Sequence, residues 1–296
     1  MSATLRIQGL SKKFGKQVVL DNINLEIEPG HIYGILGRNG TGKTTICNII
    51  TDKLFADNGE VTLDGEKISG NPEQLKRICH VKEADVFSTD TKVKDIFKTY
   101  SYFFENYDKE TEERLVKRFG INTKKAYGKL SRGQKSAVTV TAALASNAEI
   151  TIFDEPTTGL DVANRKIFYE ELMEKYSEDM GTYIIITHQV GEIERIIEKL
   201  IIIGRNKIAI DTDVDNFKSK SNLLSGKDED LKKLSFYGES NEFKKFGSTK
   251  TIFYYGNISG DDLETIKEKG IEVGKAEFED AFVTITKEVN KDDSIK

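Results

Sequence analysis

The sequence predicts an α/β fold in which helices cover a mainly parallel sheet. Short apolar segments of strand length alternate with segments of helical periodicity through most of the first 210 residues. A glycine-rich loop joins one of these strands directly to a helix. Parallel strands need crossover connections, which are usually helices, so this alternation favours a parallel sheet. No window reaches the ~20 apolar residues that a membrane-spanning helix needs.

The composition is that of a soluble globular protein with room for about two domains. The chain has 296 residues, of which 38% are hydrophobic and 31% charged, and its net charge is -5. This acidic balance argues against a nucleic-acid partner. Cys47 and Cys79 have no metal-ligand spacing, so we expect free, partly buried thiols in a reducing cytoplasm. The N-terminus lacks the apolar core of a signal peptide, so any membrane role must act through a partner.

The first elements follow from alternation and turn residues. Residues Val18–Ile27 alternate between apolar and polar side chains, which predicts a half-buried strand. Pro29–Gly30 marks a turn, and His31–Leu36 reads as a short buried strand. A helix is expected from about Lys43, and a further strand at Glu60–Leu63.

A helical insert is expected over about 89–147. Val93, Ile96 and Phe97 fall at helical spacing, and Gly120 is a plausible C-cap for a second helix. Strands are expected again at Glu149–Phe153, Thr182–Thr187, Leu200–Ile203 and Lys207–Ile210. Together these elements define a first domain at 1–212.

Residues 213–296 are expected to form a linker and a small α+β domain. The polar, lysine-rich segment Asp213–Lys233 reads as a linker or loose helix. Beyond it come apolar segments at Leu234–Tyr237, Thr251–Tyr255 and Phe278–Thr286, with helices near Glu239–Phe246 and Asp261–Lys269.

The strongest motif is a phosphate-binding loop. Residues Gly37–Thr44 match G-x-x-x-x-G-K-[ST], with an apolar strand before and a helix after. Glycines let successive backbone N–H groups surround phosphates, Lys43 would reach the β- and γ-phosphates, and the Thr44 hydroxyl would contact Mg²⁺. The candidate nucleotide-binding residues are Gly37, Arg38, Asn39, Gly40, Thr41, Gly42, Lys43, Thr44 and Thr45. The loop alone does not separate kinases, GTPases and ATPases.

Acidic residues at the end of a later strand indicate hydrolysis. Ile150–Glu155 is an apolar strand that ends in two acids, as a Walker B motif does. Asp154 would hold Mg²⁺ through water, and Glu155 would orient or deprotonate an attacking water. His188 follows the next strand at its carboxyl end, where such sheets place ligands. Asn206–Ala209 lacks the acid of a guanine-binding motif, which argues against GTP.

Taken together, these residues resemble the ATP-binding subunits of ABC transporters. Leu130–Gln134 is similar to the family signature LSGGQ, with Arg132 in place of the first glycine. The segment that follows Asp154–Glu155 resembles the family's D-loop and ends at Asp161. His188 stands at the position of the switch histidine, and Phe14 at that of the aromatic residue that stacks on adenine. The resemblance covers about Leu5 to Ile210.

The resemblance implies a fold and a mechanism. The fold is a P-loop NTPase core, in which an antiparallel β subdomain accompanies the mainly parallel sheet, with the helical insert and the α+β appendage. Two such subunits pair head to tail, as a homodimer or with a related ATPase. The signature residues Ser131, Gly133 and Gln134, with Asp161, then contact the ATP held by the partner's Walker motifs. ATP hydrolysis, with Glu155 and His188 as catalytic residues, would drive a separate membrane permease at the inner face of the cell membrane.

One residue departs from the family pattern. Glu83 stands where the family usually has a glutamine that helps to bind Mg²⁺. A carboxylate cannot donate as an amide does, although it can accept from a Mg²⁺-bound water. Glu83 is therefore either a metal contact or merely a loop acid. The surrounding segment Lys82–Phe87 is a candidate surface for contact with the permease.

The direction of transport depends on a weak motif. Phe278–Thr286 resembles the ending of bacterial exporter ATPases of drugs, peptides and polysaccharides, although its apolar residues would also serve as a domain core. We therefore expect an exporter subunit. The alternative is a soluble ABC-type ATPase of translation or DNA repair, which usually has two cassettes or a long coiled coil. A degenerate binding module is disfavoured because Lys43, Asp154, Glu155 and His188 are all present.

Overall fold

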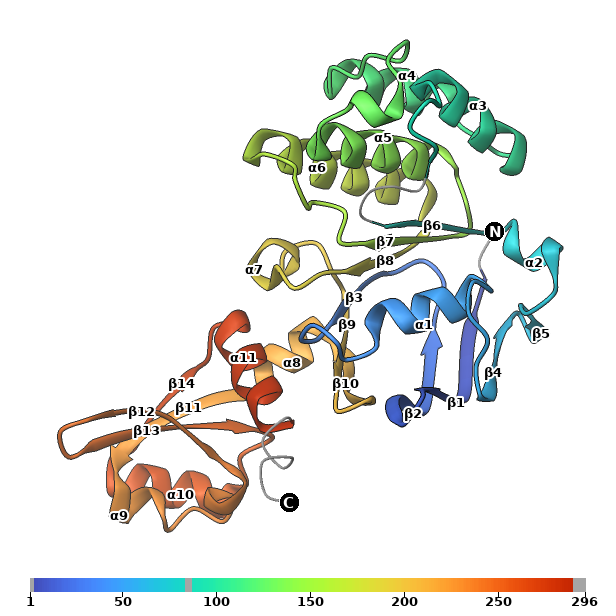
Figure 1. Ribbon diagram of the computed structural model, residues 1–296. Coiled ribbons are helices and arrows are strands. Elements are labelled where there is room, and N and C mark those ends of the chain that lie inside the picture. Colours follow the sequence, from blue (N-terminus) through green and yellow to red (C-terminus); the bar gives the residue numbers. More distant parts are fainter. Residues whose placement is uncertain (1–2, 83–86, 290–296) are drawn as a thin grey trace. The chain divides into compact units, whose positions relative to one another are not determined.

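The computed structural model describes residues 3–82 and 87–289 and divides the chain into two units (Figure 1). The first unit comprises residues 1–188 and 196–210. The second comprises residues 189–195 and 211–296. In the described ranges, no helix has both the length and the apolar character needed to cross a bilayer.

A six-stranded sheet forms the centre of the first unit. Its strand order is β10-β9-β3-β8-β7-β6. Parallel pairing joins β9 to β3, β3 to β8, β8 to β7 and β7 to β6. The strands are β3 (Ile32–Leu36), β6 (Ile78–Lys82), β7 (Ile150–Asp154), β8 (Thr182–Ile186), β9 (Lys199–Gly204) and β10 (Lys207–Asp213). Each of β3, β7 and β8 is buried along its whole length, which explains their continuous apolar sequences.

A second, antiparallel sheet has the order β2-β1-β4-β5. Its strands are β1 (Leu5–Phe14), β2 (Gln17–Ile27), β4 (Asn58–Leu63) and β5 (Glu66–Lys67). Helix α1 (Lys43–Ile50) lies between the two sheets, where its apolar residues belong to a core cluster that includes residues of both sheets (Figure 1). The opposite face of the parallel sheet is covered by α5 (Arg132–Ala145) and α6 (Val162–Asp179).

Helices gather between β6 and β7 of the chain, as the apolar spacing predicts. They are α3 (Val93–Phe103), α4 (Lys109–Arg118) and α5, with a 3₁₀ turn at Tyr127–Lys129. Phe97 and Tyr127 are nearly fully buried and pack with Val138 of α5 in one cluster. The short helices α2 (Pro72–Leu75) and α7 (Val190–Ile193) complete the elements before β9.

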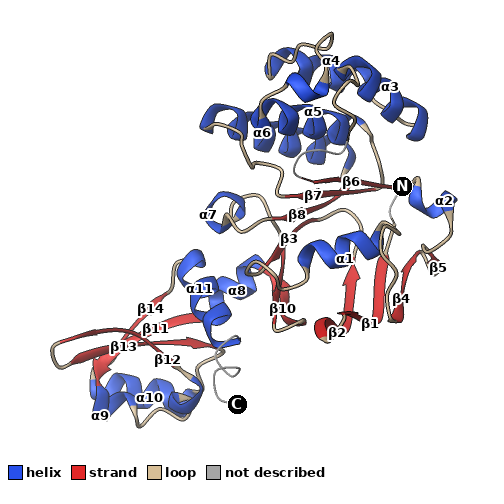
Figure 2. Cartoon of the chain, in the orientation of Figure 1, coloured by secondary structure: helices blue, strands red, loops and turns tan. Residues whose placement is uncertain are grey.

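The second unit is an antiparallel sheet with helices on it (Figure 2). The strand order is β12-β13-β11-β14, and the core cluster includes Leu224, Phe236 and Ile252. Its elements are α8 (Val214–Lys220), β11 (Ser221–Lys227), α9 (Asp228–Leu231), a 3₁₀ turn (Tyr237–Glu239), β12 (Asn241–Phe246), β13 (Thr249–Tyr255), α10 (Gly260–Lys269), β14 (Glu272–Lys275) and α11 (Phe278–Val289).

Two predictions for this unit were wrong. The helix expected near Glu239–Phe246 is instead the edge strand β12, because backbone pairing with β13 decides its conformation despite its polar sequence. The segment Asp213–Lys233, expected to be a linker or loose helix, does contain the helices α8 and α9, but between them lies β11, a strand that pairs with both β13 and β14. The run Phe278–Thr286 lies in α11. Its apolar residues Phe278, Ala281, Phe282 and Ile285 are buried, whereas Val283 is exposed.

His80 in β6 is a titratable group that the fold holds neutral. Its Nδ1 atom lies 3.1 Å from Lys53 Nζ, and since an ammonium only donates, Nδ1 accepts. Its Nε2 atom is buried and has no hydrogen-bond partner in the described part of the chain. Burial lowers the pKa of His80 to about 3, and the nearby Lys53 charge adds to this shift.

The neutral His80 predicts a loss of stability in acid. Its folded pKa lies below the unfolded value of ~6.5, so the unfolded chain binds the proton first as the pH falls. Between pH 7 and pH 5 this residue should remove ~1–2 kcal/mol from the free energy of unfolding. Urea unfolding at both pH values should show a smaller loss for His80→Gln than for the wild type. His31→Gln, a control at an exposed ion pair with Glu198, should keep the full loss.

Candidate functional site

The phosphate-binding loop joins β3 to α1 and is shaped by its glycines. Helix α1 begins at Lys43, and its N-cap Gly42 has a φ of 101°, in the region that other residues rarely adopt. A Cβ at Gly42 would lie 2.6 Å from Leu20 Cδ2 and 2.9 Å from the Val19 carbonyl oxygen. The loop can therefore pass this close to β2 only with glycine at this position.

Lys43 is held at the centre of the loop. Its side chain is buried, and Nζ donates to the carbonyl oxygens of Gly37 at 2.6 Å and Arg38 at 3.0 Å. Burial lowers the pKa of Lys43, while the nearby charges of Glu155 and Asp154 oppose this effect. Phosphate oxygens are stronger acceptors for an ammonium than neutral carbonyls. A hydrogen bond from Lys43 to a phosphate would therefore strengthen nucleotide binding.

A cavity of about 360 Å³ opens beside this lysine. Its lining residues are Gln17, Val19, Asn39, Gly40, Gly42, Lys43, Thr44, Thr45, Asp154 and Glu155. Of the predicted loop residues, Gly37, Arg38 and Thr41 are not part of this lining. The Thr41 hydroxyl donates to the Arg38 carbonyl oxygen at 2.9 Å.

Gln17 and Val19 line the cavity but were not predicted from the sequence. Phe14, the predicted adenine-stacking residue, is half exposed and pairs directly with Gln17 across the turn between β1 and β2. This register places Phe14 beside the cavity rather than in its lining. An alternating strand directly after the aromatic residue was the signal that could have revealed the two missed residues.

Asp154 ends β7 at the same edge of the sheet. In the parallel ladder it pairs with Ile186 of β8 and with Lys82 of β6. Its side chain is buried, which raises its pKa, while a hydrogen bond from the Thr44 hydroxyl opposes the shift. A threonine hydroxyl and a carboxylate that already face each other are suitable oxygen ligands for Mg²⁺. In residues 3–82 and 87–289 no group of three or more His, Cys, Asp and Glu could hold a metal ion.

Glu155 follows Asp154 with a φ of 55°, an unusual conformation for a residue with a side chain. Three contacts hold it. Its N–H donates to the Ile186 carbonyl oxygen at 2.8 Å, and the Thr187 hydroxyl donates to Oε2 at 3.1 Å. His188 Nδ1 lies 2.7 Å from Oε1. Strained backbone that is held by several contacts is typical of catalytic positions.

The signature segment begins helix α5 with a reciprocal cap. Ser131 Oγ accepts from the Gln134 N–H, and Gln134 Oε1 accepts from the Ser131 N–H, both at 3.2 Å. Gln134 therefore supports the helix start. A Cβ at Gly133 would lie 2.4 Å from the Gly159 carbonyl oxygen, so this glycine permits close contact with the D-loop. The Arg132 side chain is exposed, and its Cγ packs toward Gly159.

The signature and the D-loop share a second cavity, of about 310 Å³. Its lining residues are Phe119, Gly120, Ile121, Asn122, Leu130, Ser131, Gly133, Gln134, Ala137, Val138, Gly159, Asp161 and Asn164. Asp161 is the N-cap of α6 and accepts from the Asn164 N–H at 2.8 Å. No residue of this cavity lines the cavity at Lys43. The structure thus places Ser131, Gly133, Gln134 and Asp161 together but apart from the phosphate loop.

Glu83, the predicted additional metal contact, lies outside the described residues. The strand before it ends at Lys82, which pairs with Asp154. The predicted permease-contact segment Lys82–Phe87 is described only at its two ends.

The chain is similar in sequence to known ATP-binding proteins of transporters. A family model described as "ABC transporter" matches residues 20–158. A Nod factor export ATP-binding protein I from Cupriavidus metallidurans is 32% identical over 213 residues, covering 70% of each chain. The chain belongs to the ATP-binding subunits of ABC transporters. A zinc uptake system ATP-binding protein from Listeria innocua is 30% identical over 223 residues, covering 70% of this chain and 85% of that protein.

A solved structure of an ABC transporter ATP-binding subunit has the same fold. It aligns with a TM-score of 0.66 at 20% sequence identity and covers 73% of this chain and 92% of that one. This ABC subunit therefore binds and hydrolyses ATP to energise a transporter that includes a membrane permease.

Replacement of Lys43 by alanine should weaken ATP binding by ~10- to 100-fold, because a charge-assisted contact to phosphate contributes about 1.5–3 kcal/mol. Titration of the isolated subunit with a fluorescent ATP analogue measures the effect. Lys53→Ala is the control, since Lys53 follows the same helix in the chain but is exposed and lines a different cavity. Equal losses in both variants would contradict a direct contact between Lys43 and phosphate.

Proposed function

We propose that this ABC subunit hydrolyses ATP as one half of a head-to-tail pair, with an identical subunit or a related one. One observation supports the proposal above all: the phosphate loop and the signature line separate cavities of the same chain. Each subunit thus carries two separate half-sites, one at the phosphate loop and one at the signature, and neither is a complete nucleotide site. In the head-to-tail pair, the signature cavity of one subunit would close over the ATP at the other subunit's Lys43.

Residues of both subunits would then contact each ATP. Lys43, Thr44 and Thr45 hold the phosphates from one side, with Phe14 beside the adenine. From the other subunit come Ser131, the Gly133 backbone and the D-loop that ends at Asp161. Because the Ser131 cap is formed within its own helix, its position is set before the nucleotide arrives. Such preorganised groups stabilise transition-state charge effectively, because they need no reorganisation during the reaction.

Glu155 is the proposed general base for the attacking water. A carboxylate only accepts hydrogen bonds, so His188 Nδ1 donates to Glu155 and Nε2 remains for a second contact. This tautomer suits a histidine that orients the base or contacts the γ-phosphate. Mg²⁺, held by Thr44 and Asp154, would neutralise phosphate charge. Glu83 is retained as a proposed additional contact of that ion.

The permease would bind at the inner face of the cell membrane and hold this subunit there from the cytoplasmic side. An apolar groove of about 540 Å³ suits this contact. Its lining includes Ile78, Phe87, Tyr100, Phe103 and Phe104, and Phe103 is 63% exposed. Phe87, one end of the segment predicted to contact the permease, lines this groove. We further propose export of a drug, peptide or similar substrate, which the C-terminal run Phe278–Thr286 supports.

Glu155→Gln should keep ATP binding, lose most turnover and trap an ATP-bound dimer. The amide can still accept from Thr187, so the local backbone is retained, but it cannot take a proton from water. Turnover should fall at least ~100-fold, measured by phosphate release, and size-exclusion chromatography with ATP should show the dimer. Glu113→Gln, on an exposed part of α4, is the control. Normal hydrolysis by Glu155→Gln would exclude this residue as the base.

Ser131→Arg should separate binding from hydrolysis. Ser131 lies in the signature cavity, so a bulky cation there would obstruct the partner's ATP but leave the chain's own phosphate loop intact. ATP binding by the monomer should match the wild type, while hydrolysis that rises with protein concentration should disappear. Ser101→Arg, at an exposed site of α3, is the matched control. If Ser131→Arg monomers also lost ATP binding, the contact in trans would be refuted.

A further inference from the structure

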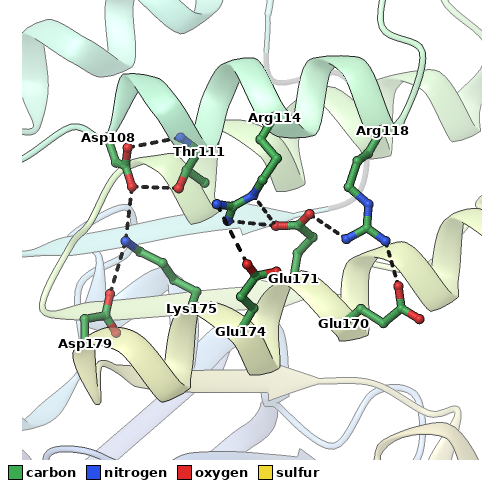
Figure 3. A network of polar contacts seen from close by, with 9 residues as sticks. All are labelled: Asp108, Thr111, Arg114, Arg118, Glu170, Glu171, Glu174, Lys175 and Asp179. Carbon is green, nitrogen blue, oxygen red and sulfur yellow. Dashed lines mark hydrogen bonds and ion pairs between the residues drawn. The ribbon is translucent and has the colours of Figure 1, made fainter.

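Helices α4 and α6 face each other through charged side chains (Figure 3). The residues of this network, which we call the α4–α6 network, are Asp108, Thr111, Arg114 and Arg118 on the α4 side and Glu170, Glu171, Glu174, Lys175 and Asp179 on α6. On α4, positions 111, 114 and 118 share one helical face, and on α6 positions 171 and 175 do. The chain uses charges where two packed helices usually meet through apolar residues.

Glu171 is the central residue of this network. Its side chain is only 1% exposed. Oε2 accepts from Arg114 Nε at 3.1 Å and Nη2 at 3.0 Å, and Oε1 accepts from Arg118 Nη1 at 2.6 Å. A buried carboxylate is costly unless cations pair with both oxygens. The helices therefore have one favourable register, in which both arginines reach Glu171.

A second ionic contact lies at the other end of the two helices. Lys175, with a side chain 6% exposed, places Nζ 3.3 Å from Asp108 Oδ2 and 3.4 Å from Asp179 Oδ2. Asp108 is also the N-cap of α4, accepting from the Thr111 N–H at 3.0 Å. The start of α4 thus contacts the end of α6. Together, the contacts at Glu171 and Lys175 prevent the two helices from sliding along each other and from rotating about a single contact.

The two helices lead to the two parts of the signature cavity. Helix α6 has Asp161 of the D-loop as its N-cap and packs on the parallel sheet, where the Phe168 ring lies 5.2 Å from that of Phe153. Helix α4 packs along α5, whose N-cap is Ser131. Helix α5 also contacts α6 directly, and the Ser136 hydroxyl of α5 donates to the Thr158 carbonyl oxygen of the D-loop segment at 2.7 Å.

We propose that Glu171 is a positioning residue for ATP hydrolysis. Through Arg114 and Arg118 it fixes the angle between the signature helix and the D-loop, and so the shape of the half-site that is offered to the partner's ATP. This inference rests on the head-to-tail pair proposed above. Glu171 touches neither the nucleotide cavity nor the signature cavity, so its effect must pass through the helices.

The experiment introduces Glu171→Gln into the Glu155→Gln subunit and measures ATP-dependent dimerisation by sedimentation, with ATP binding by the monomer measured in parallel. Misplacement by about 1 Å weakens such sites by up to ~100-fold, so we expect a dimer dissociation constant ~10- to 100-fold higher and unchanged monomer binding. Glu174→Gln is the matched control, because Glu174 is 49% exposed and lies 4.0 Å from Arg114. It should dimerise as the parent does.

The outcomes are distinct. Equal dimerisation of the Glu171→Gln and Glu174→Gln proteins would overturn the positioning role. Parallel losses of monomer ATP binding and dimerisation would also overturn it, because Glu171 would then support folding alone. If Glu171→Gln does not fold, Arg118→Gln, which leaves Glu171 paired with Arg114, must show the same selective loss. A Glu155→Gln parent that never dimerises with ATP would refute the head-to-tail pair itself.

Discussion

The parallel pairing of β3, β8 and β7 is the constraint on which the nucleotide site depends. Because these strands run side by side in one direction, their carboxyl ends meet at one edge of the sheet. The phosphate loop follows β3, Glu155 follows β7, and His188 follows β8 after one residue. Residues more than 100 positions apart in the chain are thereby placed at one cavity. The hydrogen bond from the Glu155 N–H to the Ile186 carbonyl oxygen continues this order beyond the end of β7, into the unusual backbone conformation of the proposed general base.

The signature depends on a different constraint, the close backbone contact between Gly133 and Gly159. A side chain at Gly133 would collide with the D-loop carbonyl, so signature and D-loop must be built together. The same contact explains the tolerance for Arg132, whose side chain passes over Gly159 and reaches solvent. An arginine at this position adds positive charge beside the cavity without filling it, which is compatible with a phosphate from a partner subunit.

The sequence predicted the elements whose local signals agree with their tertiary environment. The alternation before Ile27 predicted β2, and the apolar segment before Gly37 predicted β3, because burial on one or both faces leaves a direct trace in residue type. In the second unit this agreement fails. Strand β12 is a largely exposed edge rich in lysine, so its strand character comes only from pairing with β13. The position of Gln17 at the cavity also depends on its pairing with Phe14, for which the only signal in the sequence is the alternating strand that follows the aromatic residue.

The α4–α6 network could not be predicted from the sequence. Arg114, Arg118 and Glu171 read as solvent-exposed charges on amphipathic helices, and only the structure shows that the carboxylate is buried between the two cations. Apolar side chains at this junction would pack in several neighbouring registers at similar free energy, since hydrophobic burial is not directional. Paired charges do not allow several registers, because any shift of one helix leaves a buried ion without its partner. Ion pairs therefore fix the relative position of α4 and α6 more strictly than apolar packing would, even where their net contribution to stability is small.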